Sequence, residues 1–556
     1  MPRARRRRIV AATTALLVLL GGTLMTLTPF AAGEAHAAAQ HGTGHRSHHR
    51  TGHAKASPHP ATAAKPAAGH RSRAGKKTQT KPQTKPQTKA QKLAQKLARK
   101  KAQKKAQKKA AAKARAEARR KAAARAKARR EAVLRARWAK VRPRDPRTWP
   151  IWAPDHYTPP AGPKFNNPYA GRTKRRALLT HVIRTIDSTP GYRLVNPMTH
   201  RHMRCPTNPR LAPSTIKIAV YSIADLSFAD ALARAQRRCV SVKVLMNSHL
   251  TVLTSRSWGR IVKALGKRPH DWNASRSFAM RCTNGCLGTS VLHAKFFLFS
   301  RAGRAHDIVM TGSTNMTSNA VNVQWNDLFT VDGNQQLYDQ FRAHFRMMLP
   351  DRAGKGPWTY RAGRYRTTFL PAAGMNERSD DVMRTLRNVS CRGARNGAGI
   401  GGRTVLYVAM HAWFGVRGQY IADEVRHLQR EGCYVRVLYS FMSLATFEKL
   451  GSDRLPRMVV RRVQFPGALG LVANKYSHMK MLAISGHLGP DRSAWVTWTG
   501  SNNWTDRGDR ADEVTLRISS RAVYRAYVRH WKHMRDTRST AVWAKFPEPV
   551  GGGRAP

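Results

Sequence analysis

The sequence predicts an α/β fold made of two copies of one repeat, each a mostly parallel sheet flanked by helices. Two observations predict this fold. The order helix, strand, helix, strand occurs twice after residue 170, and such alternation places parallel strands beneath helices on both faces of a sheet. In each copy the same set of polar motif residues comes after this order of elements, with nearly the same spacing between the motif residues.

The first copy begins with a helical stretch near residues 175–186. Runs of β-branched and apolar residues at 216–222 and 240–246 predict two buried strands, with a helix that ends near Arg238 between them.

The second copy repeats this order. A helix is expected near 380–388, a strand at 405–410, a helix at 421–431 and a strand at 435–439. Each element of the first copy therefore has a counterpart in the second.

The six cysteines follow the same duplication. Cys205 precedes the first strand of copy one and Cys239 begins its second strand, while Cys391 and Cys433 hold matching places in copy two. An even number of cysteines in an exported chain predicts disulfides. We expect the pairs Cys205–Cys239, Cys282–Cys286 and Cys391–Cys433. No second close pair completes a zinc site around Cys282, so we expect no metal and no other cofactor.

The first forty residues have the order of a secretory signal. A basic cluster at 3–8 precedes an apolar run at 9–32 and the small-residue site Ala35-His36-Ala37. We expect residues 1–37 to be a cleaved signal peptide and the protein to be secreted, either free outside the cell or associated with the cell envelope. An uncleaved anchor is the alternative, because the apolar run could span a bilayer.

A basic arm follows at 38–140. Its later part is rich in Ala, Lys, Arg and Gln, which favour a helix, but like charges four residues apart oppose that helix in free solution. We expect the arm to be disordered alone and helical on a phosphate-rich surface; a solvated spacer is the alternative. The remaining boundaries are a Pro-rich linker at 141–170, repeat 1 at 171–350, a linker at 351–372, repeat 2 at 373–545 and a disordered tail at 546–556.

The positive charge is not confined to the arm. Lys and Arg exceed Asp and Glu by 37 − 3 = 34 over residues 1–140, which leaves (101 − 37) − (29 − 3) = 38 for residues 141–556. Charge of this size predicts attraction to an anionic membrane surface, a cell-wall polyanion or nucleic acid.

Each copy carries one motif of high specificity. The motif residues of copy one are His293, Lys295, Ser313, Asn315 and Asp327, and those of copy two are His478, Lys480, Ser501, Asn503 and Glu513. His-x-Lys on a strand places both side chains on one face, because the side-chain period is two. Gly-Ser-x-Asn then supplies a tight turn with hydroxyl, amide and backbone N–H donors that suit a phosphate.

The acids of the motif suit a supporting role. Asp327 or Glu513 could accept a hydrogen bond from a histidine ring nitrogen, which fixes the tautomer and raises the basicity of the other nitrogen.

These motifs resemble the His-x-Lys-x(4)-Asp signature of the phospholipase D superfamily with its trailing Gly-Ser-x-Asn, over residues 171–545. The resemblance implies that the two repeats pack about a pseudo-twofold axis. It also implies that His293 attacks phosphorus to form a phosphohistidine and that His478 acts as general acid and base. Lys295, Lys480, Asn315 and Asn503 would hold the nonbridging oxygens.

The sequence departs from this signature at one position of each copy. Ser300 and Ser485 stand where the family has Asp. We interpret the change as the mark of a divergent branch; a catalytically silent phosphate binder is the alternative.

The resemblance implies a phosphoric diester hydrolase, and the substrate stays open between two classes. The export signal and the similarity to secreted bacterial phospholipases D favour a monomeric phospholipase D that hydrolyses or transphosphatidylates lipid headgroups. Aromatic residues that could meet lipid are Trp413, Phe414, Trp498 and Trp504, and His411 could line the cleft or pack. An endonuclease or other nucleic-acid phosphodiesterase is the alternative, because the charge is that of a nucleic-acid binder.

Overall fold

A computed structural model describes residues 88–141, 151–192, 205–248, 252–451, 456–466, 473–538 and 540–541. The chain divides into two units, 1–101 and 102–556. The expected signal peptide, the arm before residue 88 and the expected C-terminal tail lie outside the described residues. No described helix combines the length and the apolar character that are needed to span a bilayer.

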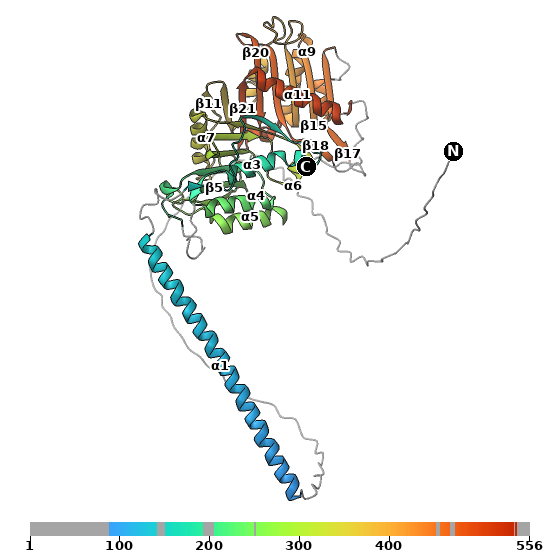
Figure 1. Ribbon diagram of the computed structural model, residues 1–556. Coiled ribbons are helices and arrows are strands. Elements are labelled where there is room, and N and C mark those ends of the chain that lie inside the picture. The colour runs from blue at the N-terminus through green and yellow to red at the C-terminus, as the bar shows by residue number, and fades with distance from the viewer. Residues whose placement is uncertain are drawn as a thin grey trace, which may run out of the picture. The chain divides into compact units, whose positions relative to one another are not determined.

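The described part of the chain begins with α1, which starts in the first unit, and continues through the second unit as a series of helices and strands (Figure 1). The helices are α1 (Lys89–Val141), α2 (Arg172–Arg175), α3 (Ala177–Asp187), α4 (Leu226–Arg237), α5 (Val252–Leu265), α6 (Ser318–Asn322), α7 (Gln335–Met348), α8 (Asp381–Arg387), α9 (Gly415–Arg430), α10 (Leu444–Leu450) and α11 (Arg521–Arg538).

The strands of the first copy, with the two that precede it, are β1 (Ile151–Trp152), β2 (Gly162–Phe165), β3 (Gly191–Tyr192), β4 (Thr215–Val220), β5 (Ser241–Asn247), β6 (Phe278–Cys282), β7 (Phe296–Ala302), β8 (Ala305–Gly312), β9 (Gln324–Trp325) and β10 (Asp327–Val331).

The strands of the second copy are β11 (Trp358–Ala362), β12 (Tyr365–Leu370), β13 (Val389–Ser390), β14 (Val405–Trp413), β15 (Tyr434–Met442), β16 (Met458–Arg462), β17 (Gln464–Pro466), β18 (Ala473–Ser477), β19 (Lys480–Leu488), β20 (Asp491–Gly500), β21 (Glu513–Ser519) and β22 (Thr540–Ala541).

The two copies form two sheets with the same strand order. The first contains β10-β8-β7-β4-β5-β6 and the second β21-β20-β19-β14-β15-β16, each extended at its edges. A helix joins the parallel strands in both copies, α4 between β4 and β5 and α9 between β14 and β15. The duplication that the sequence predicts is therefore repeated in the order of the strands.

The prediction of mostly parallel sheets was wrong. Only β4, β5 and β6 are parallel in the first sheet, and only β14, β15 and β16 in the second; the other pairs of both sheets are antiparallel. Helix crossovers connect the parallel strands, whereas short turns connect β7 to β8 and β19 to β20, and a tight turn can join only antiparallel neighbours.

Three large apolar clusters fill the second unit. One packs α3, α4 and α5 on the outer face of the first sheet, and another packs α8 and α9 on the outer face of the second. The largest lies between the sheets and takes side chains from α7, α11 and strands of both copies. The sheets therefore share one core, which fixes the two halves of the chain against each other.

Two expected linkers contain sheet strands, so the expected boundaries were wrong there. β2 lies within 141–170 and pairs with β10, and β11 and β12 lie within 351–372 and extend the second sheet through β21. The Pro content of 141–170 predicted a linker there, but β2 and β11 take edge places in their sheets, where Pro is tolerated.

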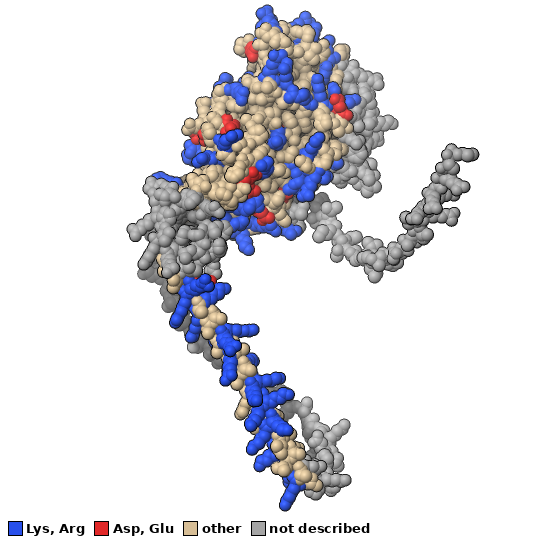
Figure 2. Space-filling view, in the orientation of Figure 1, with Lys and Arg blue, Asp and Glu red and all other residues tan. Residues whose placement is uncertain are grey.

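The later part of the arm is a helix, in contrast to the disorder expected for 38–140. α1 has 53 residues, its described side chains are exposed apart from the half-buried Glu131, and no face of it is apolar. Lys and Arg exceed Glu on it by 22 − 2 = 20, and Figure 2 shows these basic side chains along its length. The high helix propensity of Ala, Lys, Arg and Gln therefore outweighs the repulsion between their charges.

Three disulfides are present, and they join Cys205 to Cys239, Cys282 to Cys286 and Cys391 to Cys433. These are the three pairs that the sequence predicts. In each copy one disulfide joins the segment before the first parallel strand to a residue shortly before the second parallel strand: Cys205–Cys239 in the first copy and Cys391–Cys433 in the second. Disulfides of this kind are typical of extracellular proteins.

Candidate active site

The two histidines lie where the sheets meet, each just before a central strand rather than on it as predicted. His293 precedes β7, and His478 precedes β19. Each backbone N–H donates to the other half of the chain: His293 N to Asp512 O at 3.0 Å, and His478 N to Trp325 O at 2.9 Å. Both rings are therefore fixed by contacts that exist only when the two halves pack together.

His293 is backed by a carboxylate from the second copy. Its Nδ1 lies 2.7 Å from Glu513 Oε1, and Ser501 Oγ donates to the other carboxylate oxygen. Because the carboxylate accepts, Nδ1 carries the proton and Nε2 keeps its lone pair. Burial lowers the pKa of His293 to about 4, although Glu513 opposes the shift. The ring is therefore neutral near pH 7.

His478 is backed by neutral groups from the first copy. Its Nδ1 lies 2.9 Å from Asn326 Oδ1 and 3.0 Å from Ser313 O. A carbonyl oxygen can only accept, so Nδ1 again carries the proton. Burial, reinforced by Lys480 and other nearby positive groups, holds the pKa of His478 well below its ordinary value.

Asn326 therefore takes the supporting place that the sequence analysis gave to Asp327. Ser313 N donates to Asp327 O, and Ser501 N donates to Val514 O, so Asn326 and Glu513 share one register position. Asp327 accepts instead from Thr499 and from Tyr527 OH, the latter at 2.8 Å. Strand alternation turns its side chain away from His478.

The two lysines are fully desolvated beside the histidines. Lys295 donates from Nζ to His293 O, and Lys480 Nζ donates to His478 O at 2.7 Å. Burial lowers the pKa of Lys295 to about 7 and holds that of Lys480 well below its ordinary value, and Lys295 adds to the latter shift. Two buried ammonium groups next to each other favour an anion between them.

Asn315 and Asn503 follow the turns at the ends of β8 and β20. The amide oxygen of each is buried and has no hydrogen-bond partner among the described residues. A Cβ at Gly312 would overlap Asp327 O, and one at Gly500 would overlap Val514 O, so both turns need glycine. The glycines thus let one turn lie against the start of β10, next to Asn326, and the other against the start of β21, which carries Glu513.

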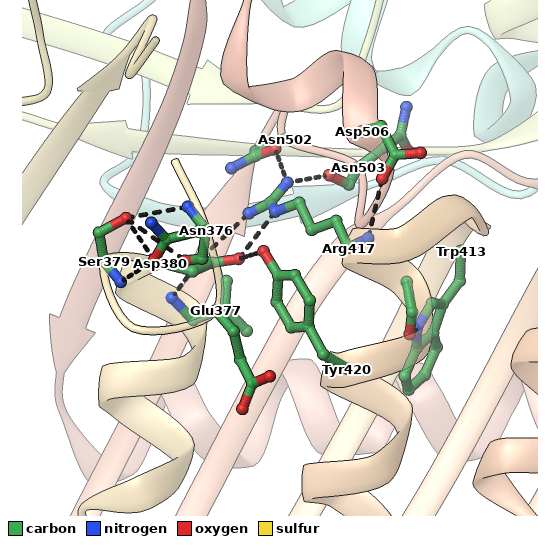
Figure 3. Close-up of polar contacts among 12 residues, drawn as sticks. Asn376, Glu377, Ser379, Asp380, Trp413, Arg417, Tyr420, Asn502, Asn503 and Asp506 are labelled. Atoms are coloured by element: carbon green, nitrogen blue, oxygen red, sulfur yellow. Dashed lines mark hydrogen bonds and ion pairs between the residues drawn. The ribbon is translucent and has the colours of Figure 1, made fainter. Parts of the chain in front are cut away.

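The turn of the second copy is held by a buried arginine (Figure 3). Arg417 Nη1 donates to Asn502 Oδ1 at 3.0 Å and to Asn503 O at 2.8 Å. Its Nε donates to Asp380 Oδ2 at 2.9 Å, and Tyr420 OH donates to the same carboxylate. Arg417 is 3% exposed. The first copy has no such ion pair among the described residues around Asn315.

An aromatic ring lies against each histidine from the end of the neighbouring strand. Tyr221 contacts His293 with ring centroids 5.4 Å apart, and His411 contacts His478 at 4.6 Å. The registers of β4 with β7 and of β14 with β19 place Tyr221 and His411 at the same position of their copies. His411 Nδ1 is bonded to Ser477 O at 2.9 Å, so this third histidine belongs to the site.

Ser300 and Ser485 lie outside the pocket. Ser300 Oγ accepts from Thr215 N, and Ser485 Oγ accepts from Gly399 N, both at 2.9 Å. Each serine therefore binds a neighbouring backbone N–H and touches none of the motif residues.

Asn326, Arg417 and Tyr221 belong to the site but were not predicted from the sequence. The spacing from the turn could have identified Asn326. Glu513 lies 13 residues after Gly500, and Asn326, which lies 14 residues after Gly312, matches this spacing better than Asp327, which lies 15 residues after Gly312. Arg417 had no signal in the sequence, since its partners Asp380 and Asn502-Asn503 come from two distant segments.

Two imidazoles whose Nδ1 atoms are held by hydrogen bonds, two buried lysine amines and two amide-bearing turns are groups that enzymes use to act on phosphodiesters. Residues 210–349 match the family model described as cardiolipin synthase, PLD-like domain, which covers the first copy. The first copy therefore contains a PLD-like domain, the domain that characterises the phospholipase D superfamily.

Solved structures with similar folds include phosphatidylserine synthase from Haemophilus influenzae Rd KW20, at 13% identity over 71% of this chain and 90% of that one, with a TM-score of 0.42. Polyphosphate kinase from Porphyromonas gingivalis has 14% identity over 59% of this chain and 47% of its own length, with a TM-score of 0.39. The phospholipase D family member Nuc from Salmonella typhimurium has 16% identity over 34% and 96%, with a TM-score of 0.24. No curated protein sequence matches the chain.

Proposed function

We propose that the protein is a secreted phospholipase D that hydrolyses or exchanges phospholipid headgroups through a phosphohistidine on His293. In this scheme His293 Nε2 attacks phosphorus while protonated His478 gives its Nε2 proton to the leaving alcohol oxygen. His478 then takes a proton from water or a second alcohol, whose oxygen attacks phosphorus and breaks the P–N bond. Lys295, Lys480, Asn315 and Asn503 bind the nonbridging oxygens.

The different partners of the two histidines support these roles. When Nε2 of His293 bonds to phosphorus and Nδ1 keeps its proton, the ring becomes cationic, and Glu513 at 2.7 Å stabilises that charge. His478 must instead release a proton. A neutral Asn326 leaves its imidazolium more acidic than a carboxylate would.

Exposed apolar side chains at the same edge of the sheet support a lipid substrate. Phe414 is 40% exposed, Val416 70% and Leu444 55%. They follow the carboxyl ends of the parallel strands β14 and β15. The end of β14 carries His411 and is hydrogen-bonded to Trp504, next to Asn503. A lipid interface would cover this apolar surface. Of the four aromatic residues expected there, only Phe414 is exposed, because Trp413, Trp498 and Trp504 pack in the core.

A nuclease is the second candidate, and the charge favours it. Residues 141–556 carry an excess of 38 basic groups, and basic side chains far outnumber acidic ones on the face drawn in Figure 2. We propose that α1 adds a second basic surface that attracts a membrane, a cell-wall polymer or nucleic acid.

Secretion and the pseudo-twofold packing of the two copies are part of the same proposal. The three disulfides support an oxidising compartment. The backbone N–H groups of His293 and His478 each donate a hydrogen bond to the other copy. Because the two copies make the same contact with each other, these bonds support twofold packing.

A substrate panel tests the proposal. The full chain is incubated with vesicles of phosphatidylcholine, vesicles of phosphatidylglycerol, and plasmid DNA, each in EDTA. Released headgroup without DNA nicking is expected. Nicking without headgroup release would favour the nuclease. If neither the lipids nor the DNA are cleaved, both candidate functions are rejected. The His293→Ala variant is the control for a contaminating enzyme.

A further inference from the structure

Three arginines and a tryptophan form a continuous row across four neighbouring strands of the second sheet, each directly opposite the next. Arg361 on β11 faces Arg366 on β12, Arg366 faces Arg517 on β21, and Arg517 faces Trp498 on β20. We refer to Arg361, Arg366 and Arg517 as the arginine row. Like charges in direct cross-strand pairs destabilise a sheet, so this arrangement costs folding free energy unless an anion accompanies it.

The carboxylates nearby do not neutralise the row. Asp381 lies 3.3 Å from Arg366, but it also pairs with Arg384 at 3.0 Å. Asp491 accepts from Ser493. Among the described residues, no carboxylate forms an ion pair with Arg361 or Arg517.

The row is only partly solvated. Arg517 is half-buried, with its guanidinium 5.5 Å from the centre of the Trp498 ring. Burial lowers the pKa of Arg517, and Arg366 and Arg361 lower it further. The Nε atom of Arg366 is buried and has no hydrogen-bond partner among the described residues. Two of the three guanidinium groups therefore lack full hydration while they repel each other.

All three arginines line one hollow of about 410 Å³ on the outer face of the sheet. A narrower hollow of about 50 Å³ shares Thr368, Trp498 and Thr515 with it and reaches Lys480. Arg517 lies four residues after Glu513 on β21, which is about 13 Å along a strand. The row is thus separate from the phosphate pocket, although Arg517 shares β21 with Glu513.

We propose that the arginine row binds a phosphate group other than the one that reacts. Guanidinium groups offer paired N–H donors that match phosphate oxygens, and the hollow has room for such a group. The bound anion would relieve the repulsion between Arg366 and Arg517. The source is either a free phosphate or a lipid headgroup, and the site does not depend on the proposed catalytic function.

The test compares two double variants of the full chain that carry the same net charge. Arg361→Gln with Arg517→Gln removes the row's unpaired charges. Arg301→Gln with Arg304→Gln, at an exposed turn of the first copy, is the control. Affinity for inorganic pyrophosphate is measured by calorimetry at 150 mM salt, about the physiological ionic strength. We expect a loss of about tenfold or more in the row variant and little change in the control.

Vesicles of phosphatidylglycerol in phosphatidylcholine separate the two sources. Weaker binding of both pyrophosphate and vesicles by the row variant indicates a lipid headgroup site, and weaker binding of pyrophosphate alone indicates a free-phosphate site. Equal affinities in the row and control variants would overturn the proposal. The thermal midpoint without ligand guards against misfolding: we expect it to rise in the row variant, and the single Arg361→Gln variant replaces the pair if it falls.

Discussion

Asn326 and Glu513 hold the same register position in the two sheets, yet one is an amide and the other a carboxylate. Each accepts from the serine of its own copy and from the histidine of the other. The site is therefore symmetric in geometry and asymmetric in charge, which gives its two histidines different acidities.

Asn326→Asp should move the alkaline limb of kcat/KM to higher pH. A carboxylate at this position would raise the pKa of His478, which burial and nearby positive groups now hold well below its ordinary value. The general acid would then stay protonated to higher pH, and we expect a shift of about one unit or more, or about 1.4 kcal/mol.

The pH profile of kcat/KM measures this shift on a soluble phosphodiester. Asp327→Asn is the matched control, because Asp327 contacts Thr499 and Tyr527 rather than His478, and its alkaline limb should stay in place. A limb that moves in the control but not in Asn326→Asp would contradict the assignment of His478 as the acid.

His293→Ala and His478→Ala should each lower kcat by about a thousandfold or more, and the double variant should be scarcely worse, because the two groups act as a unit. With a substrate whose leaving group needs no proton, His478→Ala should accumulate an acid-labile adduct, which mass spectrometry should locate on His293. Exposed His427 provides the control variant. An adduct on His478 in the His293→Ala variant would reverse the roles.

Arg417→Gln should lower kcat through Asn503 rather than through the reacting phosphate. Its guanidinium holds Asn503 O and Asn502 Oδ1, so its loss should displace the turn. In an Asn503→Ala background the same substitution should change kcat little, as a double-mutant cycle would measure.

The stability of Arg417→Gln separates positioning from folding. Asp380 would be left buried without its partner, which costs about 3 to 5 kcal/mol in either background. If the fall in kcat were as large with Asn503→Ala as without it, Arg417 would act on the fold alone. Asn502→Ala, which removes one of the four hydrogen bonds that the Arg417 side chain donates to Asn502, Asn503 and Asp380, is the milder variant.

Replacing Phe414, Val416 and Leu444 by Ser should reduce turnover of vesicles but not of a short-chain, soluble phosphodiester. These side chains are exposed beside the site, and each buried apolar residue contributes about 1.5 to 3 kcal/mol to interfacial binding. Ile400→Ser, at an exposed position of the same copy, is the control. Equal losses on both substrates would contradict a lipid interface.

Deleting residues 38–141 should leave turnover of a soluble phosphodiester unchanged and weaken binding to anionic vesicles or polyanions. α1 carries an excess of 20 basic groups and no apolar face, so its contribution is counterion release. The slope of log affinity against log salt should become shallower. An unchanged slope would mean that the arm is only a spacer.

The sequence by itself determined the two copies, the motif residues and the cysteine pairs. Each is a repeated local signal: His293 and His478 stand at the same place of two similar segments, and the spacings need no tertiary information. The central strands, such as β4 and β14, were also predictable, because a continuous apolar run has few alternatives to a buried strand.

Only the tertiary structure decided which residue supports which histidine. Glu513 reaches His293 and Asn326 reaches His478 across the contact between the copies, and no spacing within one copy encodes a contact with the other. Strand alternation then made Asn326 rather than Asp327 the partner, because a shift of one residue turns a side chain to the opposite face. The same reason kept Arg417 and the arginine row hidden in the sequence, since the fold alone brings their members together.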